Sequence, residues 1–128
     1  MLTLCVLTPK GPVLEREVDE VTAPGVAGEF GVLEGHVPFL SASRTGMLVW
    51  RRGGERGRVV VAPGFVQVDG RGVTVLVGRA ALAERVDRQE AEAQRQEAEG
   101  RLKSAPAGSP AEQLARADLE WAEALLSA

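Results

Sequence analysis

The sequence predicts a mainly β fold with an α-helical addition: an N-terminal antiparallel β-sandwich followed by a C-terminal antiparallel α-helical hairpin. Residues 1–84 contain most of the 15 glycines and of the valines, a composition typical of short strands and turns. Residues 86–128 are rich in Ala, Glu, Gln and Arg, which favour helices. Because the composition changes abruptly near Arg85, we predict two domains, a β-sandwich over 1–84 and a two-helix hairpin over 86–128.

Short apolar runs separated by glycine and proline turns predict eight strands in the first domain. These runs are Leu2–Thr8, Val13–Ala23, Glu29–Leu33, Phe39–Ser41, Gly46–Arg52, Gly57–Ala62, Phe65–Asp69 and Val73–Gly78. Many short strands at this spacing form an antiparallel sandwich or barrel. Val59–Val61 and Val73–Val77 are apolar on both faces of a strand, so we expect part of the sheet to be covered on both sides.

Two helices are predicted in the second domain, at about 87–103 and 110–126. Asp87 followed by Glu90 is a capping signal for the first helix, and Ser109-Pro110 followed by Glu112 is one for the second. The residues between them include glycine and proline, which interrupt the helical pattern. A connection this short places the two helices side by side and antiparallel.

The spacing of small residues predicts how the two helices face each other. The first helix offers Ala91, Arg95, Ala98 and Leu102, and the second offers Ala111, Ala115, Asp118 and Ala122. Alanine at such a contact allows the helices to approach closely. The same register sets Arg95 opposite Asp118, so we predict an ion pair between them that fixes the register more than it adds stability.

The second helix carries a wider apolar arc than the first helix can cover. Leu114, Trp121 and Leu125 flank the alanine row on one side, and Leu119 and Leu126 flank it on the other. This surplus either packs on the β-sandwich of the same chain, which we favour, or meets another protein. Both hold at different times if the hairpin moves.

Charge and composition exclude several classes of function. The formal net charge is −3 and the isoelectric point is about 5.2, so we expect no nucleic-acid partner. No apolar run approaches the ~20 residues that cross a bilayer, and the N-terminal residues lack the pattern of a signal peptide. The single cysteine, Cys5, excludes an internal disulfide and lies in an apolar run, so we interpret it as a buried, unreactive thiol.

No catalytic or metal centre is predicted. His36 is the only histidine and lies in a turn, so a structural or interface role is favoured over that of a general base. One histidine and one distant cysteine give no metal-ligand spacing, and glycine-rich phosphate-binding motifs are missing. Glu29 in a glycine-rich turn and four arginines around Gly53-Gly54 are either solvated or contacts for a partner; the arginines are Arg51, Arg52, Arg56 and Arg58.

The stretch Pro24–Leu40 contains four glycines and two prolines among apolar residues, as in tight chain reversals within β-structure. It resembles the P-G-x-x-G-E-F-G-V-L-x-G-H-x-P signature of the epsilon subunit of F-type ATP synthases, of bacterial and chloroplast type. The resemblance extends across nearly the whole chain, with further similar segments at Leu4–Pro9, Gly46–Leu48, Gly64–Val68 and Val73–Val77.

The resemblance implies a non-catalytic rotor subunit of the central stalk, which couples the catalytic head to the ring of c-subunits. The implied partners are the gamma subunit, the c-ring, and the beta and alpha subunits, at the cytoplasmic face of the bacterial inner membrane. By position, a tip would lie toward the c-ring and the next turn and strand near gamma; these interface residues are Gly28, Glu29, Phe30 and Gly31, then His36 and Pro38. The helical hairpin would act as a conformational brake on ATP hydrolysis.

Two departures from the family's pattern modify these expectations. Nucleotide-binding members carry [IL]-D-x-x-R-A at the start of the first helix, where this chain reads Val86-Asp87-Arg88-Gln89-Glu90-Ala91. A carboxylate at Glu90 loses a phosphate donor and adds repulsion, so we predict no bound ATP or other cofactor and interpret Asp87 as a helix cap. The second helix keeps Arg116 as a contact for the catalytic head, but carries acidic residues that would weaken it: Glu112, Glu120 and Glu123.

The alternative function is a free-standing β-sandwich interaction module whose helical hairpin forms a dimer. Co-purification with a gamma subunit, and a monomer–dimer measurement on the isolated chain, distinguish the two functions.

Overall fold

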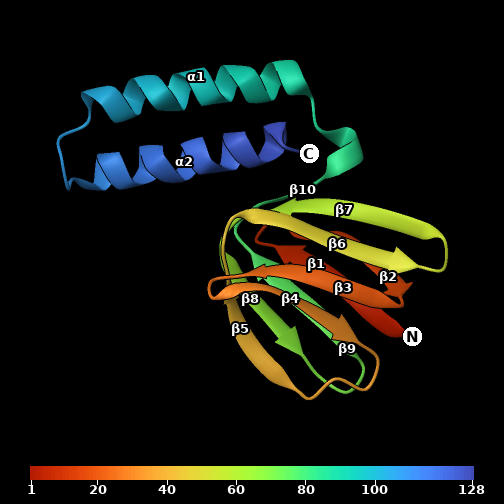
Figure 1. The fold of residues 1–128 in the computed structure, drawn as a ribbon. Coiled ribbons are helices and arrows are strands. Elements are labelled where there is room, and N and C mark those ends of the chain that lie inside the picture. The colour runs from red at the N-terminus through yellow and green to blue at the C-terminus, as the bar shows by residue number, and fades with distance from the viewer.

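The computed structural model describes residues 1–128 and consists of a β-sandwich with a two-helix hairpin laid above it (Figure 1). The elements in chain order are β1 (Leu2–Thr8), β2 (Gly11–Val18), β3 (Glu20–Gly25), β4 (Gly28–Leu33), β5 (Phe39–Ser43), β6 (Gly46–Arg52), β7 (Glu55–Val61), β8 (Gly64–Val68), β9 (Gly72–Val77), β10 (Ala80–Leu82), the 3₁₀ turn η1 (Ala83–Arg85), α1 (Arg88–Ser104) and α2 (Pro110–Leu126). The predicted fold class is confirmed.

One ten-stranded sheet forms the sandwich, in the order β10-β7-β6-β3-β5-β8-β9-β1-β2, with β4 attached to β3. The sheet curls around a core of 16 buried residues, most of them valine and leucine. All neighbouring strands are antiparallel except β1 and β9, which run parallel. The first strand of the chain therefore lies beside a strand from the end of the sandwich sequence.

The two runs predicted to be covered on both faces behave differently. Val59 and Val61 of β7 point into the sandwich core, whereas Val60 packs in a second apolar cluster beneath the helices. The prediction is therefore right for β7, because the hairpin covers its outer face. It is wrong for β9, where Val75 is buried but Leu76, on the other face, is exposed.

The segment Val13–Ala23, predicted as one strand, is two strands that meet at Asp19. Val18 and Val21 are both buried, and a spacing of three cannot place two side chains on one face of a regular strand. At Asp19 the chain stops pairing with β1 and begins to pair with β6. The Asp19 amide donates a hydrogen bond to the Arg51 carbonyl oxygen at 2.7 Å. β10 and η1 were not predicted, because three residues each are too few for a periodic signal.

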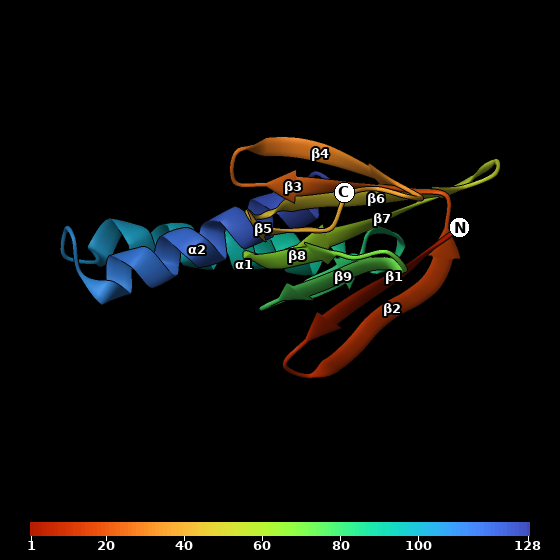
Figure 2. The same ribbon diagram turned by 90° about the horizontal axis from the view of Figure 1, so that it is seen from below.

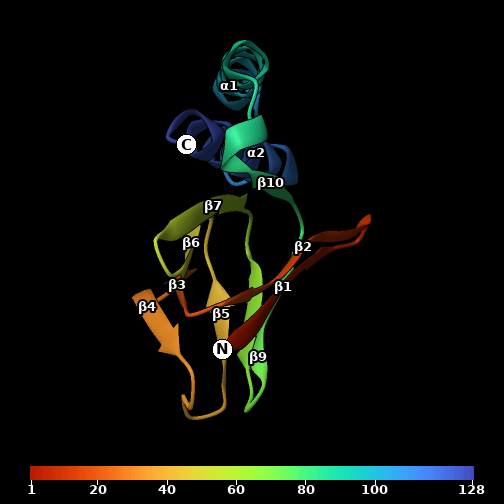
Figure 3. The same ribbon diagram turned by 90° about the vertical axis from the view of Figure 1, so that its right-hand side faces the viewer.

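The hairpin packs on the outer face of β7 and β10 through one apolar side of α2 (Figure 3). Trp121 and Leu125 are buried against Val60 and Ala62 of the sandwich, together with Ala91 of α1. The surplus apolar arc of α2 is therefore covered by the same chain, the alternative favoured above. Leu114 continues this arc but remains 60% exposed, because the end of the hairpin projects beyond the sandwich (Figure 2).

The contact between the helices is made of alanine, as predicted, but the predicted ion pair is wrong. Ala91, Ala98, Ala115 and Ala122 are buried, whereas Ala111 near the connection is exposed. Arg95 pairs with carboxylates of its own helix, at positions i−3 and i+4, and Asp118 pairs with other arginines; the Arg95 partners are Glu92 and Glu99. Carboxylates three or four residues away on the same helix can reach Arg95 without any tertiary contact, so they pair with it in preference to Asp118.

Candidate interaction surfaces

The turn between β3 and β4 is a tight, protruding tip at one end of the sandwich, the end over which the hairpin projects (Figures 1 and 2). Gly25 faces Gly28 in the ladder, and a side chain at Gly25 would lie 2.8 Å from the Gly28 carbonyl oxygen. Gly28 has φ +131°, a backbone conformation that favours glycine. These glycines hold Glu29 exposed at the start of β4, which has only β3 as a neighbour.

The structure brings the predicted tip and the predicted His36 turn together through aromatic packing. Phe30 of the tip packs edge-to-face on Phe39 with ring centroids 5.2 Å apart, and the His36 ring lies 5.1 Å from the same Phe39. His36 Nδ1 lies 2.8 Å from its neighbour's carbonyl oxygen, Val37 O, and Pro38 is exposed. The six predicted interface residues, Gly28 to Gly31 with His36 and Pro38, therefore form two adjoining segments rather than two separate sites.

A second surface, on the outer face of β5, β8 and β9, carries exposed apolar side chains beside the polar Gln67 and Thr74. Leu40, Phe65 and Leu76 are 65%, 52% and 44% exposed, respectively. Phe65 pairs with Ala42 on one side and Leu76 on the other, and Leu76 pairs with Leu7, so a continuous apolar row crosses four strands. We call the surface formed by Leu40, Phe65 and Leu76 with their neighbours Ala42 and Leu7 the apolar face. Sequence reasoning missed it, although the absence of polar alternation in Val73–Val77 was the available signal.

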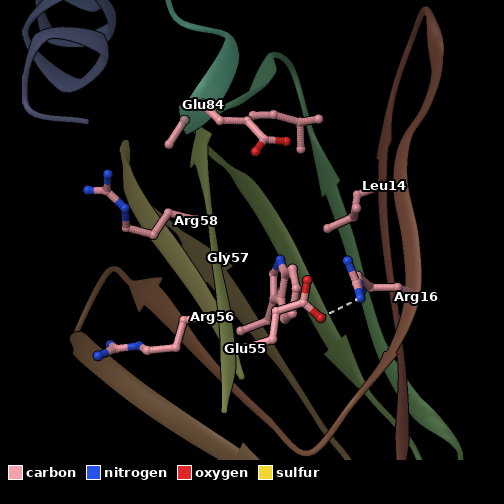
Figure 4. Close-up of a pocket in the computed structure, with 10 residues that line it drawn as sticks. Leu14, Arg16, Glu55, Arg56, Gly57, Arg58 and Glu84 are labelled. Carbon is pink, nitrogen blue, oxygen red and sulfur yellow. Dashed lines mark hydrogen bonds and ion pairs between the residues drawn. The ribbon is translucent and has the colours of Figure 1, made fainter. Parts of the chain in front are cut away.

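Three of the four arginines predicted around the β6–β7 turn lie on one face of the sheet, because Arg56 pairs with Arg51 across the strands and Arg58 follows two residues along β7. Arg51 pairs with Asp19 and Glu20 at 3.7 and 3.4 Å. The side chains of Arg56 and Arg58 are exposed and point away from Arg16 (Figure 4). The positive charges are therefore divided between local ion pairs and solvent.

A cavity of about 600 Å³ lies where the curled sheet does not close, between β2, β7 and β10 (Figure 4). Arg16 lies 4.1 Å above the Trp50 ring centroid and donates a hydrogen bond to Glu55 at 2.9 Å. A side chain at Gly57 would lie 2.1 Å from Trp50, so glycine lets the indole lie flat against β7. Arg16 and Glu55 form an ion pair and therefore neutralise each other at the wall of this cavity.

A third surface joins the helices to the sandwich through Asp118 of α2. Its Oδ1 accepts a hydrogen bond from Arg79, in the β9–β10 loop, and its Oδ2 accepts one from Arg101 of α1 at 2.9 Å. The hydrogen bond from Arg79, and then that from Arg101, hold the pKa of Asp118 below its ordinary value against the opposing effect of burial. The guanidinium of Arg79 also lies 5.7 Å from the Trp121 ring centroid.

The remaining predicted site residues lie apart from these surfaces. Asp87 is the N-cap of α1 and accepts hydrogen bonds from the Gln89 and Glu90 amides at 3.0 and 3.2 Å, as its interpretation as a cap requires. Arg116 is exposed on α2. No group of three or more His, Cys, Asp or Glu side chains is arranged to hold a metal ion. No helix has the length and apolar character to cross a bilayer.

An uncovered apolar sheet face beside a protruding turn is a surface for binding other proteins, which indicates the class of protein-interaction subunits. Residues 1–83 match the family model of the ATP synthase Delta/Epsilon chain β-sandwich domain. The chain belongs to the epsilon chains of F-type ATP synthases, which are non-catalytic subunits.

Relatives named ATP synthase epsilon chain share more than two-fifths of the aligned residues with this chain. The ATP synthase epsilon chain of Geotalea uraniireducens is 43% identical over 97 residues, which are 76% of this chain and 70% of the relative. That of Thermodesulfovibrio yellowstonii is 42% identical over 107 residues, 84% of this chain and 76% of the relative.

Two solved structures share the fold. A chain in the Euglena gracilis mitochondrial ATP synthase, in a structure of OSCP, F1 and the c-ring, has a TM-score of 0.81 at 24% identity and covers 98% of this chain and 79% of that one. A chain in the central stalk and c-ring of the Tetrahymena thermophila mitochondrial ATP synthase has a TM-score of 0.59 at 14% identity. The match covers 98% of this chain and 94% of that one.

Proposed function

We propose that this epsilon chain is a rotor subunit of the central stalk, in which residues 1–84 bind the gamma subunit and the c-ring and residues 86–128 regulate ATP hydrolysis. Membership of the epsilon family supports this function, as does the likeness in fold to chains of assemblies that contain the c-ring or the central stalk. The subunit would be peripheral, at the cytoplasmic face of a bacterial inner membrane, and would need no cofactor of its own.

The observation that carries the proposal is the apolar face. Leu40, Phe65 and Leu76 lie on three adjacent strands with more than two-fifths of their surface in water. Phe65 and Leu76 are joined by apolar partners into a row, and Leu40 is exposed beside it on β5. Exposed apolar rows of this kind mark protein-binding sites. Gamma would cover this face, because β5 follows directly from the His36 turn, which we expect near gamma from the family resemblance.

The glycine-built tip is the proposed contact with the c-ring. Glu29 is exposed on a turn whose shape the glycines fix, and the adjoining Phe30–Phe39 packing anchors the tip to β5. A rigid tip beside the gamma-binding face lets one small domain hold two partners at once. His36 and Pro38 would line the boundary between those two contacts.

The hairpin is the proposed regulatory element, through Arg116 and its neighbours on α2. In the docked arrangement, α2 places Arg116 in solvent, where a partner can reach it. The acidic residues on the same helix would weaken a contact with an acidic partner. The alternative of a dimerising hairpin loses support, because Trp121 and Leu125 are already buried in the same chain.

Co-purification with the gamma subunit of the same organism tests the proposal. Phe65→Glu and Leu76→Glu each place a charge in the apolar face, so we expect at least a tenfold loss of gamma retained on a tagged epsilon chain. Leu114→Glu is the matched control, because it adds the same charge at an exposed leucine on the hairpin. Equal retention of gamma by all three variants would contradict the proposal.

A further inference from the structure

Asp118 lies where α1, α2 and the sandwich meet, and its two oxygens serve different neighbours. We propose that this carboxylate is the latch that fastens the helical hairpin to the sandwich. Oδ1 holds Arg79 of the sandwich and Oδ2 holds Arg101 of α1. One side chain therefore ties together the two contacts of α2, that with the other helix and that with the β-domain.

Arg79 is a firm point of attachment because its own backbone is fixed to the sandwich. The Arg79 carbonyl accepts a hydrogen bond from the Ala62 amide at 2.9 Å, just beyond the paired strands β7 and β10. Asp118 and Trp121 are three residues apart on α2 and so lie on the same side of the helix. Both reach Arg79, one by a charged hydrogen bond and one by its ring face, so α2 holds the guanidinium at two points.

No other ion pair performs this task. Among the ion pairs of the chain, only Arg79–Asp118 links the helices to the sandwich; the rest lie within the sandwich or within the hairpin. The remaining contact is the apolar cluster around Trp121, and apolar burial has little directional preference. The Asp118 side chain is only 24% exposed, so solvent screens its pairs less than it screens an open surface pair.

The two ends of the latch differ in what happens when the hairpin leaves the sandwich. Asp118 keeps Arg101, which moves with it, whereas Arg79 is left without a carboxylate. Release therefore costs one charged contact and leaves the helix pair intact, so the hairpin detaches as a unit. That this detachment regulates hydrolysis rests on the proposed function; the latch itself is a property of the isolated chain.

Hydrogen exchange on the isolated full chain tests the latch. We expect Asp118→Asn and Arg79→Gln each to raise exchange of α2 amides about three- to tenfold, the range of a partly buried charged pair. The double variant should exchange more slowly than the product of the two single effects predicts, because both changes remove the Arg79–Asp118 contact, although each also removes a contact of its own. High salt should raise exchange in the natural chain and have less effect in the variants.

Two matched controls remove the same charges elsewhere. Glu120→Gln changes an exposed carboxylate of α2, and Arg52→Gln changes an exposed arginine of the sandwich; neither should alter exchange of α2. Unchanged protection of β-strand amides shows that each variant is folded. Additive effects of the Arg79 and Asp118 changes, or an Asp118→Asn variant that behaves like Glu120→Gln, would overturn the latch. Because no synthase is present, these outcomes are independent of gamma binding.

Discussion

The sandwich and the hairpin are stabilised in different ways. Sixteen buried residues and continuous strand pairing hold the sandwich, whereas five buried residues and one ion pair hold the hairpin on it. The helices themselves meet through alanines, which bury little area. A core of the first kind is lost only by unfolding, but a contact of the second kind separates while both parts remain folded. The difference supports the proposed roles, in which the sandwich is a rigid binding platform and the hairpin is a regulatory element that can detach.

The largest expected effect is on the sandwich core. Leu48 is fully buried there, so Leu48→Ala should lower the free energy of unfolding by about 2–5 kcal/mol, from lost burial and the cavity left behind. Chemical denaturation followed by circular dichroism measures it. A loss below about 1 kcal/mol would show that the core repacks and would weaken the contrast between the two regions.

The next effect is confined to the hairpin. Trp121 is 8% exposed between α2 and the sandwich, so Trp121→Ala should remove about 2–4 kcal/mol from docking and release the helices. Limited proteolysis should then cut within 86–128 while residues 1–84 stay resistant. If the sandwich becomes equally sensitive, the two regions unfold together and the comparison fails.

Acid should weaken the docking of the hairpin on the sandwich. The folded pKa of Asp118 lies below the ordinary value of 3.8, because Arg79 and then Arg101 donate hydrogen bonds to it. Its contribution to docking is therefore complete above about pH 5 and is lost as the pH falls through the folded pKa. In a Trp50→Phe background, Trp121 fluorescence reports the change, and Asp118→Asn should flatten that pH dependence.

The smallest effect is at a helix end. The Ser109 hydroxyl accepts a hydrogen bond from the Glu112 amide at 3.1 Å, so Ser109→Ala should destabilise α2 by about 1 kcal/mol. Amide exchange in the first turn of α2 measures this local loss. Docking near Trp121, at the other end of the helix, should be unchanged; a change there would mean that α2 frays along its whole length.

Local patterns were predictable from the sequence, and long-range choices of partner were not. The helix caps at Asp87 and Ser109, and the buried alanines, follow from spacing along one segment. The partner of Asp118 could not be predicted from spacing, because Arg79 lies 39 residues away in the sequence, in a loop that only the fold brings near. The spacing predicted that Arg95 pairs with Asp118 across the hairpin, but Arg95 pairs instead with two carboxylates on its own helix.

Two of the candidate interaction surfaces show the same contrast between local patterns, which could be predicted, and long-range ones, which could not. The glycine-rich tip is encoded in one continuous stretch, so its shape and exposure were readable. The apolar face combines single residues from β5, β8 and β9, each of which also reads as core. Only the curl of the sheet decides which of the two faces is filled and which is left open.

The parallel pairing of β1 with β9 has a consequence for synthesis on the ribosome. Thr3 cannot meet Gly72 until nearly the whole sandwich has been translated, so the first strand waits for one of the last. The helices emerge after that closure and find a completed surface on which to settle. Truncated nascent chains ending before β9 should therefore bind chaperones that recognise exposed apolar strands, and chains that include it should escape them.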